Sequence, residues 1–143
     1  MTPKQVGTLF NNPTLKNLKH LNLRFNLDIC DALKLLATSP YVKELETLNL
    51  RNTNLSPDVI ELLVSSLNFS KLQTLDLSLN YGIGDLCAIA LMDKPTVRFL
   101  RVLNLEQTNL TNESVRLFSE NPYLINLKTL DISQNPQVDL RQF

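Results

Sequence analysis

The chain has 143 residues, 43% of them hydrophobic, and its 14 basic residues balance its 14 acidic ones. This length fits one domain, and a formal net charge of zero gives no overall field that would attract nucleic acid or a membrane surface. No apolar run approaches the ~20 residues of a membrane-spanning helix, and the N-terminal sequence MTPKQVGTLF lacks the layout of a signal peptide. We therefore expect a cytoplasmic protein without a nucleic-acid or membrane partner.

The first segment, residues 3–12, is predicted to form a short helix that ends at Pro13. Val6, Leu9 and Phe10 fall on one face at helical spacing. The stretch VGTLFNNPTLKNL parallels VRLFSENPYLINL near the other end of the chain, so residues 1–17 look like the second half of a repeating unit. This half-repeat serves as an N-terminal cap, or Met1 opens a fragment of something longer.

A leucine pattern, L-x-x-L-x-L, then returns five times. A fixed period of this length indicates stacked units, each with an apolar face that only its neighbours can bury. We expect one domain, residues 1–143, with full repeats at 18–44, 45–71, 72–99 and 100–126 and a partial repeat at 127–143. The copies begin at intervals of 27, 27, 28 and 27 residues, at Leu18, Leu45, Leu72, Leu100 and Leu127.

Each full repeat is predicted to contain a strand at the leucine pattern, a turn and a helix. Ser56-Pro57-Asp58 is a good helix start, with a capping side chain, a preset φ and an acid near the helix dipole. The inward face of that helix is expected to include Leu67. In the third repeat, Ile83-Gly84-Asp85 replaces the capped start, and a shorter helix is expected. The helices are expected to end at a proline column, Pro13, Pro40, Pro95 and Pro122.

A small polar residue follows every strand pattern by three positions, at Asn26, Thr53, Asn80, Thr108 and Asn135. A buried amide or hydroxyl at this point can bond the backbone groups that a turn leaves unpaired. With the leucines, this column resembles the leucine-rich repeat family, whose consensus is L-x-x-L-x-L-x-x-N-x-L. The repeat length is closest to the ribonuclease-inhibitor-like class. Thr53 and Thr108 depart from the asparagine, and we expect fewer bonds to the turn there.

The resemblance implies an α/β solenoid with about five strands, a curved parallel sheet on its concave side and helices on its convex side. Its leucines would point into the core, and alternate strand residues would point outward. Such an outward surface has no evident internal role, so we expect it to bind a protein partner. The candidate binding residues on this face and its rim are His20, Arg24, Phe25, Asn49, Arg51, Asp76, Leu79, Asn104, Glu106 and Asp131.

Two features of this surface have alternative interpretations. Arg24 and Arg51 gather at one end and the acids toward the other, which suits a dipolar face that orients a partner. The alternative is a set of ordinary solvated charges, with Arg51 paired to Glu46 or to an acid at a helix end. Phe25 and Leu79 at the rim are candidate anchors, or each folds over its turn as local packing.

The sequence offers little support for catalysis, metals or cofactors. His20 is the only histidine and has no relay partner at a suggestive spacing. Acids spread over three strands would not converge on one cation, which needs six or more oxygens. A phosphate-cradling glycine loop is also lacking. Cys30 and Cys87 lie two repeats apart, beyond the ~7 Å limit of a disulfide, and are expected to be small buried side chains.

The preferred function is therefore a non-catalytic protein-interaction module whose partner is another protein, with no cofactor. The alternative is a recognition segment of a larger protein, such as a ubiquitin-ligase substrate receptor, an immune-type sensor or a bacterial effector. An enzyme is disfavoured. We also expect residues 127–143 to leave the last repeat uncovered, because the tail is too short to rebuild a helix. This end would then associate with another copy or continue into further repeats.

Overall fold

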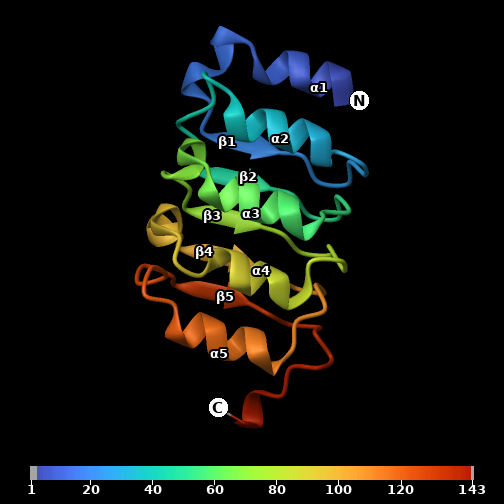
Figure 1. Ribbon diagram of the computed structural model, residues 1–143, viewed down its shortest axis with the longest axis vertical. Helices are drawn as coiled ribbons and strands as arrows, with labels where there is room; N and C mark the ends of the chain where they lie inside the picture. Colours follow the sequence, from blue (N-terminus) through green and yellow to red (C-terminus); the bar gives the residue numbers. More distant parts are fainter. Residues whose placement is uncertain (1–2, 143) are drawn as a thin grey trace.

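The computed structural model describes residues 3–142 and consists of one layer of strands and one layer of helices, both running the length of the molecule (Figure 1). A single parallel sheet has the order β1-β2-β3-β4-β5. Its strands are β1 (His20–Asn22), β2 (Thr47–Asn49), β3 (Thr74–Asp76), β4 (Val102–Asn104) and β5 (Thr129–Asp131). The helices are α1 (Pro3–Phe10), α2 (Cys30–Thr38), α3 (Pro57–Ser65), α4 (Gly84–Leu91) and α5 (Asn112–Glu120). Short 3₁₀ turns are η1 (Pro13–Asn17), η2 (Leu67–Phe69), η3 (Pro95–Phe99) and η4 (Leu140–Gln142).

The pairing register confirms the predicted solenoid. Leu48 pairs with Leu75, and Leu75 pairs with Leu103, so the second leucine of each repeat lies beside the same leucine of the next. Consecutive helices pack against each other along the opposite layer. Each leucine pattern forms one strand of only three residues. In the full repeats, the remaining residues form the turns and the helix that lead the chain back to the start of the next strand.

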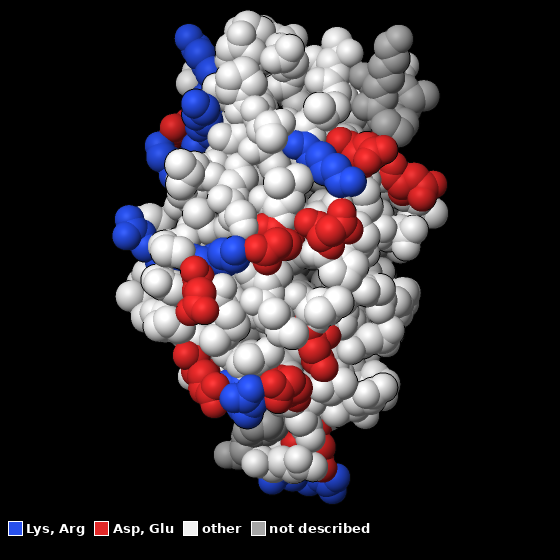
Figure 2. All heavy atoms as spheres, in the orientation of Figure 1, with Lys and Arg blue, Asp and Glu red and all other residues white. Residues whose placement is uncertain are grey.

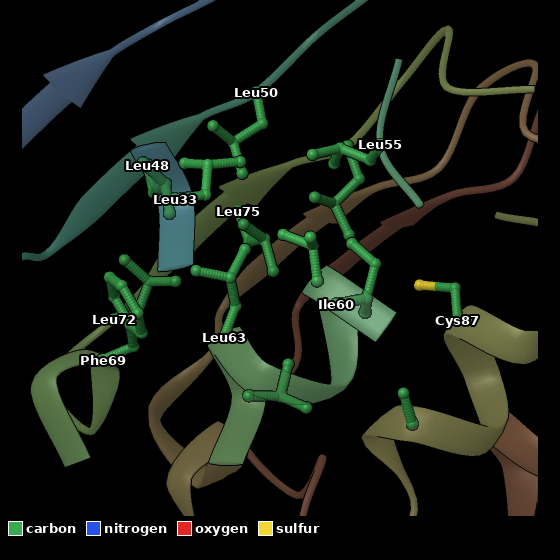
Figure 3. Close-up of a cluster of buried hydrophobic side chains, with 14 of the residues drawn as sticks. Leu33, Leu48, Leu50, Leu55, Ile60, Leu63, Phe69, Leu72, Leu75 and Cys87 are labelled. Carbon is green, nitrogen blue, oxygen red and sulfur yellow. The ribbon is translucent and has the colours of Figure 1, made fainter. Parts of the chain in front are cut away.

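The core lies between the two layers and is made chiefly of the leucine columns. Figure 3 shows Leu48 and Leu75 pointing from neighbouring strands toward Ile60 and Leu63 of α3. Leu48 is 1% exposed and Leu75 is 4% exposed. Burial of an aliphatic side chain to this degree contributes about 1.5–3 kcal/mol relative to leaving it in water, so the stacked leucines are the main stabilising contacts between repeats.

Helix ends follow the prolines, with one departure from the predicted pattern. The helices α1, α2, α4 and α5 end shortly before Pro13, Pro40, Pro95 and Pro122, respectively. In the second repeat, the prediction that Leu67 faces inward is wrong. The helix α3 ends at Ser65, and Leu67 begins η2 with 78% of its surface exposed. Leu67 stands in the proline column, and Phe69, two residues later, is buried like the equivalent Val42 and Val97 of the neighbouring repeats. Leu9 is also half outward, at 37% exposure.

The shorter helix of the third repeat is confirmed, and it is joined to the following helix by Asp85. Its carboxylate accepts hydrogen bonds from the Thr111 amide at 2.9 Å, the Thr111 hydroxyl at 2.6 Å and the Ser114 hydroxyl. Partial burial raises the pKa of Asp85, but the bonds from Ser114 and Thr111 outweigh that effect and leave the pKa below its ordinary value. One acid of α4 therefore fixes the start of α5.

The polar column forms a ladder of turn-to-turn hydrogen bonds. The Asn80 side-chain amide donates to the carbonyls of Leu77 in its own turn and of Leu50 in the preceding turn, both at 2.8 Å. Its side-chain oxygen accepts from the amides of Thr53 at 3.0 Å and Leu55 at 3.1 Å. Asn135 repeats this arrangement one interval later, accepting from the Thr108 and Leu110 amides.

The threonines in the same column form fewer hydrogen bonds, as expected, but the backbone amides of their turns still have acceptors. The Thr53 hydroxyl donates to the Leu50 carbonyl in its own turn at 2.7 Å and has a longer contact of 3.4 Å with the Asn80 side-chain oxygen. The remaining amides of that turn are satisfied by Asn80 of the next repeat. Because Asn80 and Asn135 each serve two turns, they supply acceptors for the amides of the two threonine turns that precede them.

The two ends of the solenoid are covered differently. At the N-terminal end, Val6 and Phe10 of α1 are buried against α2, and the Ser39 hydroxyl donates to the Phe10 carbonyl at 2.6 Å. At the C-terminal end, the tail turns toward the start of α5, where the Asp139 amide donates to the Asn112 side chain at 2.7 Å. Two open hollows border Leu130 of the last strand. Among residues 3–142, no helix is long and apolar enough to cross a bilayer.

Candidate protein-binding surface

The outward side chains of the five strands form the surface to which the predicted binding residues belong. Those of β2, β3 and β4 are half-buried, whereas His20 and Asn22 of β1 are exposed. The register brings equivalent positions side by side, so that Asn49 lies between Asn22 and Asp76, and Asn104 lies between Asp76 and Asp131. The predicted residues of the strand face therefore lie on one continuous surface.

The middle column of this surface has a structural role that the sequence analysis missed. In every repeat its side-chain oxygen accepts a hydrogen bond from the backbone amide two residues later, which turns the chain out of the strand. The acceptors Asn49, Asp76, Asn104 and Asp131 receive the amides of Arg51 at 3.0 Å, Ser78 at 3.0 Å, Glu106 at 2.9 Å and Ser133 at 2.9 Å. The expectation that this face has no internal role is therefore wrong for this column.

The third outward column contains an ion pair that spans two strands. Arg51 donates from one guanidinium nitrogen to the Ser78 hydroxyl at 2.7 Å and to the Glu106 carboxylate at 2.8 Å. The side chains of Arg51 and Glu106 are only 29% and 18% exposed. The suggested pairing of Arg51 with Glu46 is wrong, because Glu46 lies 2.7 Å from Lys19 at the other end of the strands.

Further hydrogen bonds extend this ion pair over the middle of the sheet. Asp76 accepts from the Asn49 side chain at 3.0 Å and from the Ser78 hydroxyl at 2.6 Å. Glu106 also accepts from Gln134 at 2.7 Å. The centre of the concave face is thus a connected polar network, defined by Asn49, Arg51, Asp76, Ser78, Glu106 and Gln134, in which Arg51 is paired with Glu106 and Asp76 accepts hydrogen bonds from neutral donors.

The first-strand end of the face has a different character. Arg24 and Phe25 are both exposed, Phe25 at 57%, and the Arg24 guanidinium lies 5.9 Å from the centre of the Phe25 ring. Among residues 3–142, Arg24 has no carboxylate within the 4.0 Å of an ion pair. His20 is exposed on the same strand. This end presents an exposed aromatic ring and a cation that has no ion-pair partner among the described residues, with the exposed His20 side chain on the same strand.

Comparison with known proteins agrees with this architecture. A family profile described as "Leucine Rich repeat" matches residues 70–92. The C-terminal domain of tropomodulin from Caenorhabditis elegans has a similar structure, with a TM-score of 0.65 over 93% of this chain and 83% of that one. The chain is a leucine-rich repeat solenoid. The two sequences are 16% identical, so this likeness concerns the fold alone, and no curated protein matches the chain in sequence.

The leucine-rich repeat solenoid holds its rim residues in an unusual backbone conformation. The residue after the last outward strand position has a positive φ in every repeat, 60° at Phe25 and 58° at Leu79. The equivalent residues Asn52, Gln107 and Gln134 have φ between 52° and 56°. A left-handed backbone is sterically costly for a residue with a Cβ. The sequence does not predict this left-handed conformation, since none of the five rim residues is glycine. Phe25 projects into solvent, whereas Leu79 is half-buried.

Asp131 lies outside the central network and has hydrogen bonds of its own. Asp131 accepts from the Ser133 side chain and amide, which, with the charge of Arg51, hold its pKa below the ordinary value. Within the part of the chain that is described, no group of three or more His, Cys, Asp or Glu residues is placed to hold a metal ion. Both cysteines are free thiols, and burial raises the pKa of Cys87 to about 12. Cys30 is half-exposed, contrary to the expectation of burial.

Proposed function

We propose that this chain is a non-catalytic protein-binding module that receives a protein partner on its concave strand face, with Arg24 and Phe25 as the primary contacts. Leucine-rich repeats are a protein-interaction fold. The observation that supports this location is the contrast between Arg51, whose charge is answered by Glu106, and Arg24, whose charge has no acidic neighbour among residues 3–142.

The two parts of the face would contribute in different ways. An exposed cation beside an aromatic ring offers a charge-assisted hydrogen bond and a large apolar contact, which are typical of interface hot spots. The central network would present fixed donors and acceptors, because its side chains are already held in place and need little ordering on binding. The wider predicted set, His20, Asn49, Asp76, Leu79, Asn104, Glu106 and Asp131, would form the surrounding contact area.

This assignment makes a direct prediction for binding. A partner captured with the wild-type chain should bind Arg24→Glu at least about tenfold more weakly, mainly through slower and salt-dependent association. Phe25→Ala should also weaken binding, through faster dissociation. Surface plasmon resonance at two ionic strengths measures both. The matched control is Lys34→Glu, the same charge reversal on the convex helix α2. Equal affinity of Arg24→Glu and wild type would place the binding site elsewhere.

Several narrower predictions accompany this proposal. We propose residues 1–143 as one repeat domain, with the repeat boundaries predicted from the sequence and a cytoplasmic location. The alternative prediction is that the chain is a recognition segment of a larger protein, such as a ubiquitin-ligase substrate receptor, an immune-type sensor or a bacterial effector.

Self-association through the C-terminal end is a further part of the proposal. It is supported by Leu127, Leu130 and Ile132, which stay only half-buried, and by Leu140, which is 60% exposed. Sedimentation over a concentration series should then reveal a dimer. A strictly monomeric chain with protected amides in β5 would contradict it.

A further inference from the structure

The zero net charge of the chain conceals a strong separation of charge. The loops that lead into the five strands carry seven Lys or Arg residues and two Glu, a surplus of five positive charges. These loops are residues 16–19, 43–46, 70–73, 98–101 and 125–128. The rest of the chain carries the compensating negative surplus. Figure 2 shows Lys and Arg side chains along the upper part of the left edge, where the strands of Figure 1 begin, with acidic side chains lower on the same edge.

These loops lie side by side, so their charges form a continuous edge. The Arg101 amide donates to the Gln73 carbonyl at 2.8 Å, and the Lys128 amide donates to the Arg101 carbonyl at 2.9 Å. The Asn126 side chain donates to the Arg98 carbonyl at 2.7 Å. The loops 70–73, 98–101 and 125–128 are therefore fixed to one another by backbone hydrogen bonds.

The two halves of this edge differ in how their cations are neutralised. In the N-terminal half, Lys19 pairs with Glu46 and Lys71 reaches back to Glu44, each at 2.7 Å. In the C-terminal half, Arg98, Arg101 and Lys128 form no ion pair with any residue of the described range 3–142. This half keeps three positive charges that are free to meet an external anion.

Two large apolar side chains belong to the same loops as these free cations, Phe99 to residues 98–101 and Ile125 to residues 125–128. Phe99 is 43% exposed and Ile125 is 78% exposed. The Arg98 guanidinium lies 4.7 Å from the centre of the Phe99 ring, a distance suited to a cation–π contact that holds the charge over the aromatic face. Beside Phe99 is an open hollow of about 220 Å³ lined by Glu46, Lys71, Gln73, Phe99 and Arg101, whereas Ile125 borders a separate hollow with Leu124 and Leu127. We call Arg98, Phe99, Arg101, Ile125 and Lys128 the basic flank.

We propose that the basic flank binds an acidic protein segment that carries an apolar side chain between its carboxylates. The carboxylates would meet Arg98, Arg101 and Lys128, and the apolar side chain would cover Ile125 or enter the hollow beside Phe99. This ligand satisfies both the charge and the exposed apolar surface. A nucleic-acid backbone would satisfy the charge but would place phosphates against Ile125, which a phosphate cannot cover favourably. The site is separate from the concave face.

The test uses a fluorescein-labelled peptide of Glu residues interrupted by two Leu, with fluorescence anisotropy at low salt as the readout. Its Gln-for-Glu analogue, poly(U) RNA and phosphatidylserine vesicles are the comparison ligands. We expect the Glu–Leu peptide to bind most tightly. The double variant R98E/R101E should weaken it at least about tenfold, and the single variant I125S should weaken it severalfold while keeping all charges.

The matched control is the double variant K16E/K43E, which makes the same charge change in the N-terminal half of the edge. It should retain most of the affinity for the Glu–Leu peptide. The proposal is overturned by equal losses in the two double variants, which would indicate only a general field. It is also overturned by tighter binding of poly(U) or vesicles, by equal binding of the Gln analogue, or by no peptide binding at all. Because Arg24 and Phe25 are untouched, these outcomes leave the concave-face proposal to its own experiment.

Discussion

The first repeat, at β1, and the third repeat, at β3, carry the same leucine pattern in different surroundings. Leu75 of β3 is packed between two neighbouring strands and is 4% exposed, whereas the equivalent Leu21 of β1 is only half-buried. Asn80 bonds two turns, whereas Asn26 donates only to the carbonyls of Leu23 and Arg24 in its own turn, among residues 3–142.

The comparison teaches that position along the solenoid decides what a repeat residue does. In the interior, the outward arginine is held by Ser78 and Glu106. At the first strand, the corresponding Arg24 extends into solvent beside Phe25. Interior repeats use their polar residues to stabilise the stack, and the first repeat has polar residues available for a partner.

The largest expected difference between the third and first repeats is the loss of stability when a core leucine is truncated. Leu75→Ala should lower the free energy of unfolding by ~2–5 kcal/mol, because it removes fully buried methyl groups and leaves a cavity between repeats. Leu21→Ala should cost about 1–2 kcal/mol, since half of that side chain is already in contact with water. Urea denaturation of both variants, with matched m-values, measures the difference. Equal losses would mean that the first strand is as well covered as the third.

A somewhat smaller difference is expected for the polar ladder. Asn80→Ala leaves the buried amides of Thr53 and Leu55 without an acceptor, at about 1–3 kcal/mol for each group that finds no water. Asn26→Ala should cost about 1 kcal/mol, because it removes donors only from its own, more exposed turn. Thermal melts at equal ionic strength compare the two. An Asn26 variant as unstable as the Asn80 variant would contradict the two-turn role.

The smallest expected effect is a pH-dependent change in stability. It arises from the hydrogen bonds of Asp85 between the third and fourth repeats. The folded-state pKa of Asp85 lies below its ordinary value, so the charged form stabilises the fold above the unfolded pKa of about 4. That contribution is lost as the pH falls through the lower, folded-state pKa. Wild type should therefore be more stable than Asp85→Asn at pH 7 and should converge with it at strongly acidic pH. A stability difference that does not change with pH would rule out this linkage.

Most of the fold could be predicted because the leucine columns report directly on which side chains a neighbour buries. The strand register follows from that spacing, and the shorter α4 was predicted from Ile83-Gly84-Asp85, which replaces the capped helix start. The placement of Leu67 could not be predicted, because helical spacing continues past Ser65 in the sequence while the chain tightens into a 3₁₀ turn. The left-handed backbone at Phe25 was hidden because no glycine marks it.

The predicted binding surface was harder to resolve from the sequence. The pairing of Arg51 with Glu106 joins residues 55 positions apart and two strands away, and only the folded register brings them together. The hydrogen bonds of Asn49 and Asp76 to the amides two residues later are local, and an Asx-turn pattern repeated in every copy could have revealed them. The basic flank was hidden because an overall charge of zero says nothing about where the charges lie.

The asparagine ladder also gives the solenoid a direction. Asn80 and Asn135 each accept amides from the turn before them, so a turn is protected by the repeat that follows it. When the last repeat opens transiently, the amides of Thr108 and Leu110 lose their acceptor and begin to exchange their hydrogens with solvent. Opening of the first repeat releases no amide of the second turn, because Asn80 still holds it. For the turn amides, motion at the C-terminal end should therefore spread inward by one turn. The amides that enter the strands have the opposite dependence, since Glu46 and Thr47 donate to the Lys19 carbonyl and would be released by opening of the first repeat.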